Sequence, residues 1–242
     1  MSFMSQINST YWLANIARNM VPDTVAVAHT DPRLTWNNLH PEEAPALVKM
    51  VASRRREYAA GRAAAHAALG QISVFNAPVI SGHDRAPIWP ENTIGSISHT
   101  NSVCLAMVAH KRDVRSIGVD VEPYEALEQG LIKNICNSDE IKWLDKQPVS
   151  HRNHLAKLVF SAKECVYKCQ YPLTKQMLTF HAVHIQINKT AGTFSATFKH
   201  ASGVFHTGYT LQGQFFIGQG LILTTAVLLN DTETTSLQNK EN

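Results

Sequence analysis

The segment that most constrains the fold runs from residue 116 to residue 122, because its side chains alternate strictly between two characters. On one face of the predicted strand lie the apolar residues Ile117, Val119 and Val121. On the opposite face lie Gly118, Asp120 and Glu122. Two carboxylates on one face repel each other unless a positive group lies between them, and Mg²⁺ is a natural partner because it takes oxygen ligands. The alternative is an ordinary pair of solvated charges, since the pattern is short and common.

A second segment, from Leu155 to Cys169, shows the clearest helical period of the chain. Its polar side chains form one stripe: Lys157, Ser161, Glu164 and Lys168. If this stripe faces the strand, Glu164 completes a site of three carboxylates and Lys168 lies beside metal-bound phosphates. The alternative is an exposed ion pair between Glu164 and Lys168.

The remaining pattern mixes helices and strands without a regular βαβ repeat, which predicts an α+β fold. Short strands are expected near Val25, Val27 and Leu34, and a proline-rich loop over 76–93. Helices are predicted over 41–69, over 125–144 with an interruption at 134–138, and over 155–169, where Tyr171-Pro172 ends the last one. Further strands are predicted over 94–98, 103–109, 184–187, 193–198, 209–211, 215–217 and 221–229.

Composition excludes several classes of protein. The 242 residues are 44% hydrophobic and carry a net charge of +3, so the chain is an ordinary globular protein that can bury a core. The four cysteines lack the spacing of a zinc site, and we expect Cys165 and Cys169 to pack as small apolar residues. We find neither a secretory signal nor an apolar stretch that spans a bilayer, and expect a cytoplasmic protein with a disordered tail at 231–242.

Several segments, in order, resemble the signatures of the 4′-phosphopantetheinyl transferase superfamily. Residues 118–122 (GVDVE) resemble its Gly-(Ile/Val)-Asp-(Ile/Val)-Glu motif, and residues 160–168 (FSAKECVYK) resemble its (Trp/Phe)-(Ser/Thr)-x-Lys-Glu motif, with Cys165 in place of the usual Ala or Ser. Upstream, residues 54–65 (RRREYAAGRAAA) and 95–100 (GSISHT) resemble two further motifs. The linker at 84–90 (DRAPIWP) is similar to that of the two-half members, which include enterobactin synthetase component D.

The resemblance implies two similar α+β halves related by pseudo-two-fold symmetry, with coenzyme A bound between them. The halves would be 1–113, on the adenosine and phosphate side, and 114–230, on the metal and catalytic side. Mg²⁺, or Mn²⁺, would be held by Asp120, Glu122 and Glu164. The catalytic residues would be Glu164, as candidate base, Lys168 and Asp120. Coenzyme A would be bound by Arg55, Arg62, Arg85, Ser98, His99 and Lys168.

The implied reaction moves the 4′-phosphopantetheine arm of coenzyme A to a serine of an apo carrier protein and releases 3′,5′-ADP. The carrier would be a peptidyl, aryl or acyl carrier of siderophore or nonribosomal peptide synthesis, and the enzyme a monomer with neither a nucleic-acid partner nor a membrane span. Two alternatives stay open. The carboxylates also suit a Mg²⁺-dependent nuclease or phosphohydrolase, and the basic cluster at 54–62 suits a nucleic-acid-binding module, although no known nucleic-acid-binding motif accompanies it.

Overall fold

The computed structural model describes residues 3–230, so the predicted disordered tail at 231–242 lies outside the described residues. The helices are α1 (Phe3–Asn19), α2 (Ala52–Gln71), α3 (Gln129–Ile135), α4 (Ser138–Asp145) and α5 (Val149–Thr174), with 3₁₀ turns η1 (Ala44–Lys49) and η2 (Phe180–Ala182). The strands are β1 (Ala26–Thr30), β2 (Ile80–Ser81), β3 (Pro87–Ile88), β4 (Thr93–His99), β5 (Cys104–His110), β6 (Val114–Pro123), β7 (Val183–Asn188), β8 (Thr193–Phe198), β9 (Thr210–Gly218) and β10 (Leu221–Leu229). This mixture confirms the predicted α+β class.

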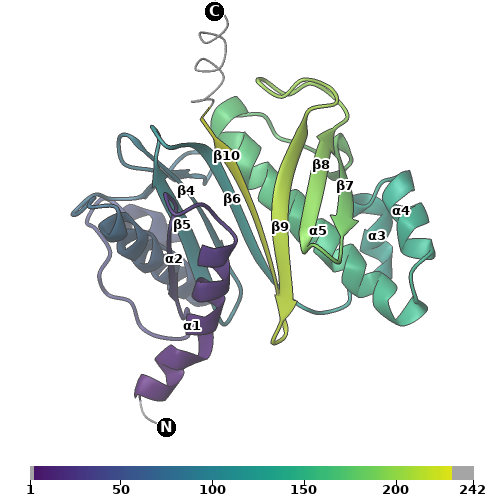
Figure 1. Ribbon diagram of the computed structural model, residues 1–242. Helices are drawn as coiled ribbons and strands as arrows, with labels where there is room; N and C mark the ends of the chain where they lie inside the picture. The colour runs from purple at the N-terminus through teal and green to yellow at the C-terminus, as the bar shows by residue number, and fades with distance from the viewer. Residues whose placement is uncertain (1–2, 231–242) are drawn as a thin grey trace, which may run out of the picture.

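The strands form two main antiparallel sheets that lie side by side (Figure 1). One has three strands in the order β1-β5-β4, and the other has five in the order β6-β10-β9-β8-β7. A short β2-β3 hairpin lies apart from both. The two sheets meet where β4 of the first lies beside β6 of the second. Residues near the ends of these two strands can therefore contact residues of both sheets.

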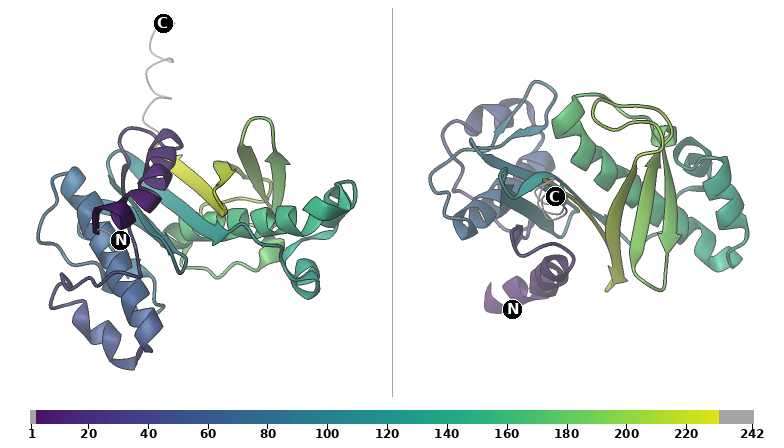
Figure 2. Two further views of the ribbon diagram at one scale, coloured as in Figure 1. Left: turned by 90° about the horizontal axis from the view of Figure 1, so that it is seen from below. Right: turned by 45° about the horizontal axis from the view of Figure 1, so that its top comes forward.

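Helices lie on both sides of the layer that the two sheets form (Figure 2). Behind the sheets in Figure 1, α2 packs on the three-stranded sheet and α5 on the five-stranded sheet, while α1 covers the front near β1 and β10. The α2 interface is built from alanines on both elements, among them Ala64, Ala65, Ala28 and Ala106. Their small side chains let the helix approach the sheet closely, which fixes the positions of the charged residues at its N-terminal end.

Serine side chains join the two sheets. The amide of Val119 donates a hydrogen bond to Ser96 Oγ at 3.1 Å, and the amide of Val121 donates to Ser98 Oγ at 3.2 Å. Both serines are buried. Hydroxyl groups on β4 therefore satisfy two backbone donors of β6 that a continuous sheet would satisfy with carbonyl groups.

The middle strands and the C-terminal strands follow the predicted boundaries within two residues, except that 209–211 and 215–217 form the single strand β9. Several expectations from the sequence differ from the structure. Leu34 lies outside any strand, and the helix α1 was not predicted. The helix predicted over 41–69 begins only at Ala52, because Met50 and Val51 are extended and separate it from η1.

A further difference concerns the end of α5, which continues through Pro172 to Thr174. Proline lacks an amide donor and its ring crowds the carbonyl of the preceding turn. The last turn still closes, because the amide of Lys175 donates to the carbonyl of Tyr171 at 2.8 Å. Lys175 adopts a left-handed φ of 55°, which ends the helix.

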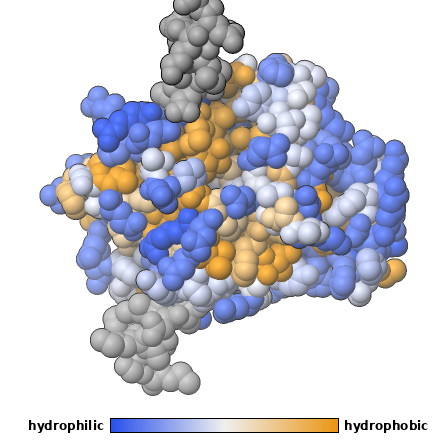
Figure 3. All heavy atoms as spheres, viewed as in Figure 1, coloured by the Kyte–Doolittle hydropathy of each residue, from blue (hydrophilic) through white to orange (hydrophobic). Residues whose placement is uncertain are grey.

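On the face seen in Figure 1, apolar side chains gather along the middle, over the upper part of β10, while hydrophilic ones cover the right edge over α3 and α4 (Figure 3). The C-terminal part of β10 contributes Leu229, which is half exposed. Within residues 3–230, none of the helices has both the length and the apolar character that crossing a membrane requires.

Candidate active site

Close packing between β6 and α5 creates the site. Gly118 faces α5, and a side chain there would overlap the carbonyl oxygen of Cys165 and lie 3.0 Å from Cys169 Cβ. The predicted apolar face of β6, with Val119 and Val121, is fully buried on the other side. As the alternation predicted, Asp120 and Glu122 therefore project toward the polar stripe of α5.

Asp120 is the centre of the polar contacts, and its side chain is buried. One carboxylate oxygen, Oδ1, accepts hydrogen bonds from Lys168 Nζ at 2.7 Å and from Ser98 Oγ at 3.0 Å. The other, Oδ2, accepts a hydrogen bond from Ser161 Oγ at 2.8 Å. Lys168 also donates to Ser98 Oγ at 3.0 Å. One carboxylate thus joins β4, β6 and α5, and a buried negative charge is compensated by an ammonium group.

The two other predicted carboxylates lie in the same electrostatic environment. Glu122 forms an ion pair of 2.5 Å with Lys157, yet burial and the charge of Asp120 keep the pKa of Glu122 above its ordinary value. Burial also raises the pKa of Glu164, and the negative charges of Asp120 and Glu122 raise it further. Among residues 3–230, Glu164 has no hydrogen-bond or ion-pair partner, whereas Glu122 and Asp120 each pair with a lysine. Its oxygens are therefore free to bind a ligand or accept a proton.

This donor set matches the chemistry of a hard divalent cation, because it consists of carboxylate oxygens whose mutual repulsion a cation would relieve. In the described part of the chain, no three Asp, Glu, His or Cys side chains are already grouped around one metal position. Lys168 and Lys157 instead neutralise Asp120 and Glu122. The residues fit the ion by charge and ligand type, and the assignment of Asp120, Glu122 and Glu164 as its ligands stays a prediction.

His99 lies at the end of β4 and connects this cluster to α2. Its Nε2 is 2.6 Å from Arg54 Nη1, and the same guanidinium donates to Glu57 Oε2 at 3.0 Å. Burial and the positive charge of Arg54 lower the pKa of His99. The charges of Lys168 and Asp120 also influence the pKa of His99, so His99 lies close to this cluster.

The three predicted arginines are placed differently from one another. Arg62 is buried, with its guanidinium 4.3 Å from the centre of the Tyr58 ring and its Nη2 donating to Ser81 Oγ at 3.1 Å. Arg85 lies in the exposed β2-β3 loop with a φ of 65°. Arg55 is not brought to the cluster: its Nε donates to the carbonyl of Met50 at 2.8 Å, at the start of its own helix.

The arginine that contacts the cluster, Arg54, was not among the predicted site residues, and a signal for it was present. Gly61 packs against Ile97 of β4, where an added side chain would lie 3.3 Å from a methyl group. Residues 54, 57 and 61 share one face of a helix, because they are three and four positions apart. The glycine therefore identifies the face of α2 that meets β4, and that face carries Arg54 and Glu57 rather than Arg55.

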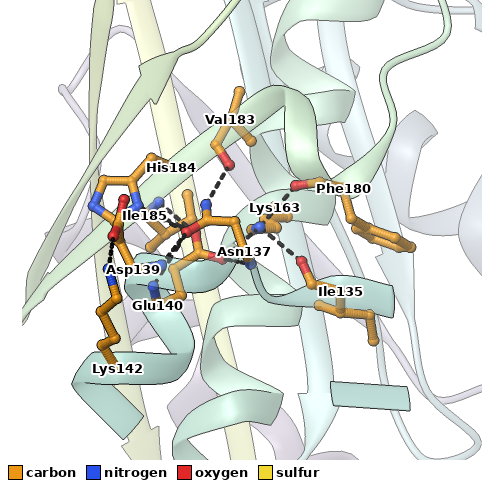
Figure 4. Close-up of polar contacts among 10 residues, drawn as sticks. All are labelled: Ile135, Asn137, Asp139, Glu140, Lys142, Lys163, Phe180, Val183, His184 and Ile185. Carbon is orange, nitrogen blue, oxygen red and sulfur yellow. Dashed lines mark hydrogen bonds and ion pairs between the residues drawn. The ribbon is translucent and has the colours of Figure 1, made fainter. Parts of the chain in front are cut away.

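Lys163, which precedes Glu164, bonds to a separate set of residues and fixes the orientation of α5 (Figure 4). Its Nζ donates hydrogen bonds, each 2.7 Å long, to the carbonyls of Ile135 and Phe180 and to Glu140 Oε2. Glu140 in turn accepts from the amide of Ile185 at 2.7 Å. Both charged side chains are almost fully buried, so this pair links α5 to α4 and to β7 from the inside.

Comparison with known proteins identifies two matching regions. Residues 42–109 match a family model described as the 4′-phosphopantetheinyl transferase N-terminal domain, and residues 116–223 match the 4′-phosphopantetheinyl transferase superfamily. The 4′-phosphopantetheinyl transferase Npt of Nocardia iowensis is 34% identical over 72% of this chain and 76% of its own. PptT of Mycobacterium tuberculosis is 33% identical over 78% of this chain and 85% of its own. Enterobactin synthase component D of Salmonella typhi is 39% identical over 48% of this chain and 47% of its own.

Proposed function

The chain belongs to the 4′-phosphopantetheinyl transferase superfamily, and on that basis we propose that the cluster around Asp120 is its active site. A member of this superfamily is a transferase that uses coenzyme A to modify carrier proteins. The group transferred is the 4′-phosphopantetheine arm, the acceptor is a serine hydroxyl of the carrier, and the other product is 3′,5′-ADP. The relatives include an enterobactin synthase component, which supports a role in siderophore or other secondary metabolite synthesis.

The proposed halves are 1–113 and 114–230. In support of this division, the three-stranded sheet draws all its strands from residues before 111, and the five-stranded sheet draws all of its strands from residues after 113. The two matched family regions divide the chain at the same turn. The proposed site then lies where the halves meet, with Ser98 and His99 from the first and Asp120, Glu164 and Lys168 from the second.

Asp120, Glu122 and Glu164 are the proposed ligands of Mg²⁺ or Mn²⁺. Bound there, the cation would supply positive charge to the pyrophosphate oxygens of coenzyme A. Lys168 is held between Ser98 and Asp120. Its ammonium group would add positive charge beside the same oxygens. Ser98, His99, Arg62 and Arg85 are the proposed contacts for the remaining phosphate groups, and Arg54 replaces Arg55 in this set. In phosphoryl transfer, such positioning and charge account for most of the catalysis.

Glu164 is the proposed base for the carrier serine. A serine hydroxyl is a weak nucleophile at neutral pH, and a nearby carboxylate accelerates its attack by accepting the proton. Burial raises the pKa of Glu164, which makes the carboxylate a better proton acceptor. Since Glu164 has no ion-pair partner among the described residues, it is free to accept that proton.

One observation carries the proposal: at the junction of β4, β6 and α5, Asp120 is bonded to Ser98 and Lys168, and its charge raises the pKa of Glu164. The test is incubation of the purified chain with an apo carrier protein, coenzyme A and Mg²⁺, followed by mass spectrometry of the carrier. We expect wild type to attach the arm, Asp120→Ala and Glu164→Gln to lose transfer while staying folded, and Asp113→Ala to retain it. Hydrolysed coenzyme A with an unmodified carrier would instead indicate a phosphohydrolase.

The carrier, oligomeric state and location follow as finer proposals. Peptidyl, aryl and acyl carriers are all candidate acceptors, and a panel of apo carriers would separate them by arm attachment. We expect a monomer, because the site draws its residues from one chain. The proposed location is the cytoplasm, which cell fractionation would test.

A further inference from the structure

The loop between β2 and β3, residues 82–86, forms a short and well-defined hairpin. The amide of Gly82 donates to the carbonyl of Ala86 at 2.8 Å, and the amide of Arg85 donates to the carbonyl of Gly82 at 2.9 Å. Asp84 Oδ1 accepts a further hydrogen bond from the amide of Ala86 at 3.0 Å. We call residues 81–87 the strap. Because these bonds fix its backbone, the strap presents Asp84 and Arg85 together on its exposed side.

The tip of the strap crosses to the other half of the chain. Asp84 Oδ2 accepts a hydrogen bond from the hydroxyl of Tyr171, on α5, at 2.7 Å. Lys175 Nζ lies 3.9 Å from the same oxygen. The Tyr171 hydroxyl lowers the pKa of Asp84, and the ionised carboxylate raises the pKa of Tyr171. This contact connects the first half to a residue one helical turn beyond Lys168.

The base of the strap contacts a second group of the proposed coenzyme A site. Ser81 accepts a hydrogen bond from Arg62 Nη2 at 3.1 Å. The neighbouring Nε of Arg62 is buried and has no hydrogen-bond partner among residues 3–230. A buried guanidinium donor without a partner is costly, and an anionic ligand would satisfy it. The strap therefore extends from an arginine with an unused donor to the helix that carries Lys168.

Arg85, in the strap, is already among the proposed phosphate contacts, and we propose that the hydrogen bond between Asp84 and Tyr171 holds the strap so that Arg85 stays in its binding position. This inference rests on the proposed function. Asp84 and Tyr171 act as positioning residues, since neither contacts the reacting atoms. Without their hydrogen bond, the tip of the strap keeps only the longer ion pair with Lys175, so coenzyme A dissociates faster while the chemistry at Asp120 and Glu164 is unchanged.

The test compares Tyr171→Phe with Tyr167→Phe in the full chain. Both variants remove one hydroxyl from α5, but that of Tyr167 donates to Met177 Sδ at 2.8 Å within the same half. We expect Tyr171→Phe to raise the Kd of coenzyme A, measured by calorimetry, by about three- to tenfold, the effect of one lost hydrogen bond. Its kcat at saturating coenzyme A and its Tm should match wild type, and Tyr167→Phe should leave the Kd unchanged.

A double-mutant cycle with Asp84→Asn gives a second, independent measurement, because the two substitutions should not add if they break one contact. The inference is overturned if Tyr171→Phe leaves the Kd within about twofold of wild type, if Tyr167→Phe weakens binding equally, or if kcat falls while the Kd stays constant. A wild-type chain that binds coenzyme A without transferring its arm would overturn the proposed function and not the strap. A wild-type chain that binds no coenzyme A would overturn both.

Discussion

Replacing Gly118 by alanine tests whether the approach of α5 to β6 builds the site. The added Cβ would overlap the Cys165 carbonyl oxygen and lie 3.0 Å from the Cys165 carbonyl carbon and from Cys169 Cβ. Carbon atoms pack best at ~3.5–4.0 Å, so the helix and the strand must separate by about 1 Å. Since Lys168 Nζ lies 2.7 Å from Asp120 Oδ1, a shift of this size breaks the hydrogen bond.

A displacement of about 1 Å at catalytic groups can cost ~100-fold in rate, so we expect kcat/KM of Gly118→Ala to fall by about that factor. Overpacking should also destabilise the fold by about 1–3 kcal/mol, which for a chain of this length lowers the Tm by about 2–4 °C per kcal/mol. Arm transfer and thermal unfolding are the two assays. Gly130→Ala is the matched control, because nothing lies within 4 Å of an added Cβ there. A Gly118→Ala variant with wild-type activity and Tm would refute the reasoning.

Three further predictions concern the buried charges. Lys163→Met leaves Glu140 buried without its cation, which should cost about 3–5 kcal/mol in urea unfolding; a loss below about 1 kcal/mol would contradict this account. Burial opposes ionisation of Glu43, but hydrogen bonds, first of all from His66, outweigh burial and lower the pKa of Glu43. Wild type should therefore be more stable than Glu43→Gln by a full margin above pH 4.5, and the margin should shrink as the pH falls below that value. A difference in stability that stays constant in acid would argue against this account. Arg62→Lys removes the unused Nε donor and should raise the KM for coenzyme A several-fold with little change in kcat; steady-state kinetics with an unchanged KM would exclude Arg62 from the phosphate site.

Much of the fold was predictable where apolar and polar side chains recur with the period of a strand or a helix. The strand β6 alternates because one face packs in the core and the other meets α5, and its bounds were predicted within two residues. The helix α1 was missed although Leu13, Ala14 and Ala17, which are buried in the core, recur at helical spacing in its C-terminal half. Pro172 was misleading, since a proline in the last turn removes a hydrogen bond without ending the helix.

The candidate site was predictable in part for a similar reason. Glu164 and Lys168 share a helical face, so periodicity alone could direct both toward Asp120. The role of Lys163 could not be found in this way, because its partners lie at Ile135, Glu140 and Phe180, in segments that only the fold brings together. Which arginine of 54–56 meets His99 depends on the rotation of α2. Gly61 marks the face of the helix that carries Arg54, but the sequence does not say that this face packs against β4.

The hydroxyl junction between β4 and β6 limits which residues evolution can accept there. Ser96 and Ser98 must be short enough to fit between two backbones and must offer an oxygen to the amides of Val119 and Val121. Serine meets both demands, and threonine does so with small adjustments. Alanine at both positions would leave the amides of Val119 and Val121 buried without a hydrogen-bond acceptor. Ser98 also bonds to Asp120 and Lys168. A substitution at this position would therefore change both the alignment of the two halves and the charge balance of the proposed catalytic centre.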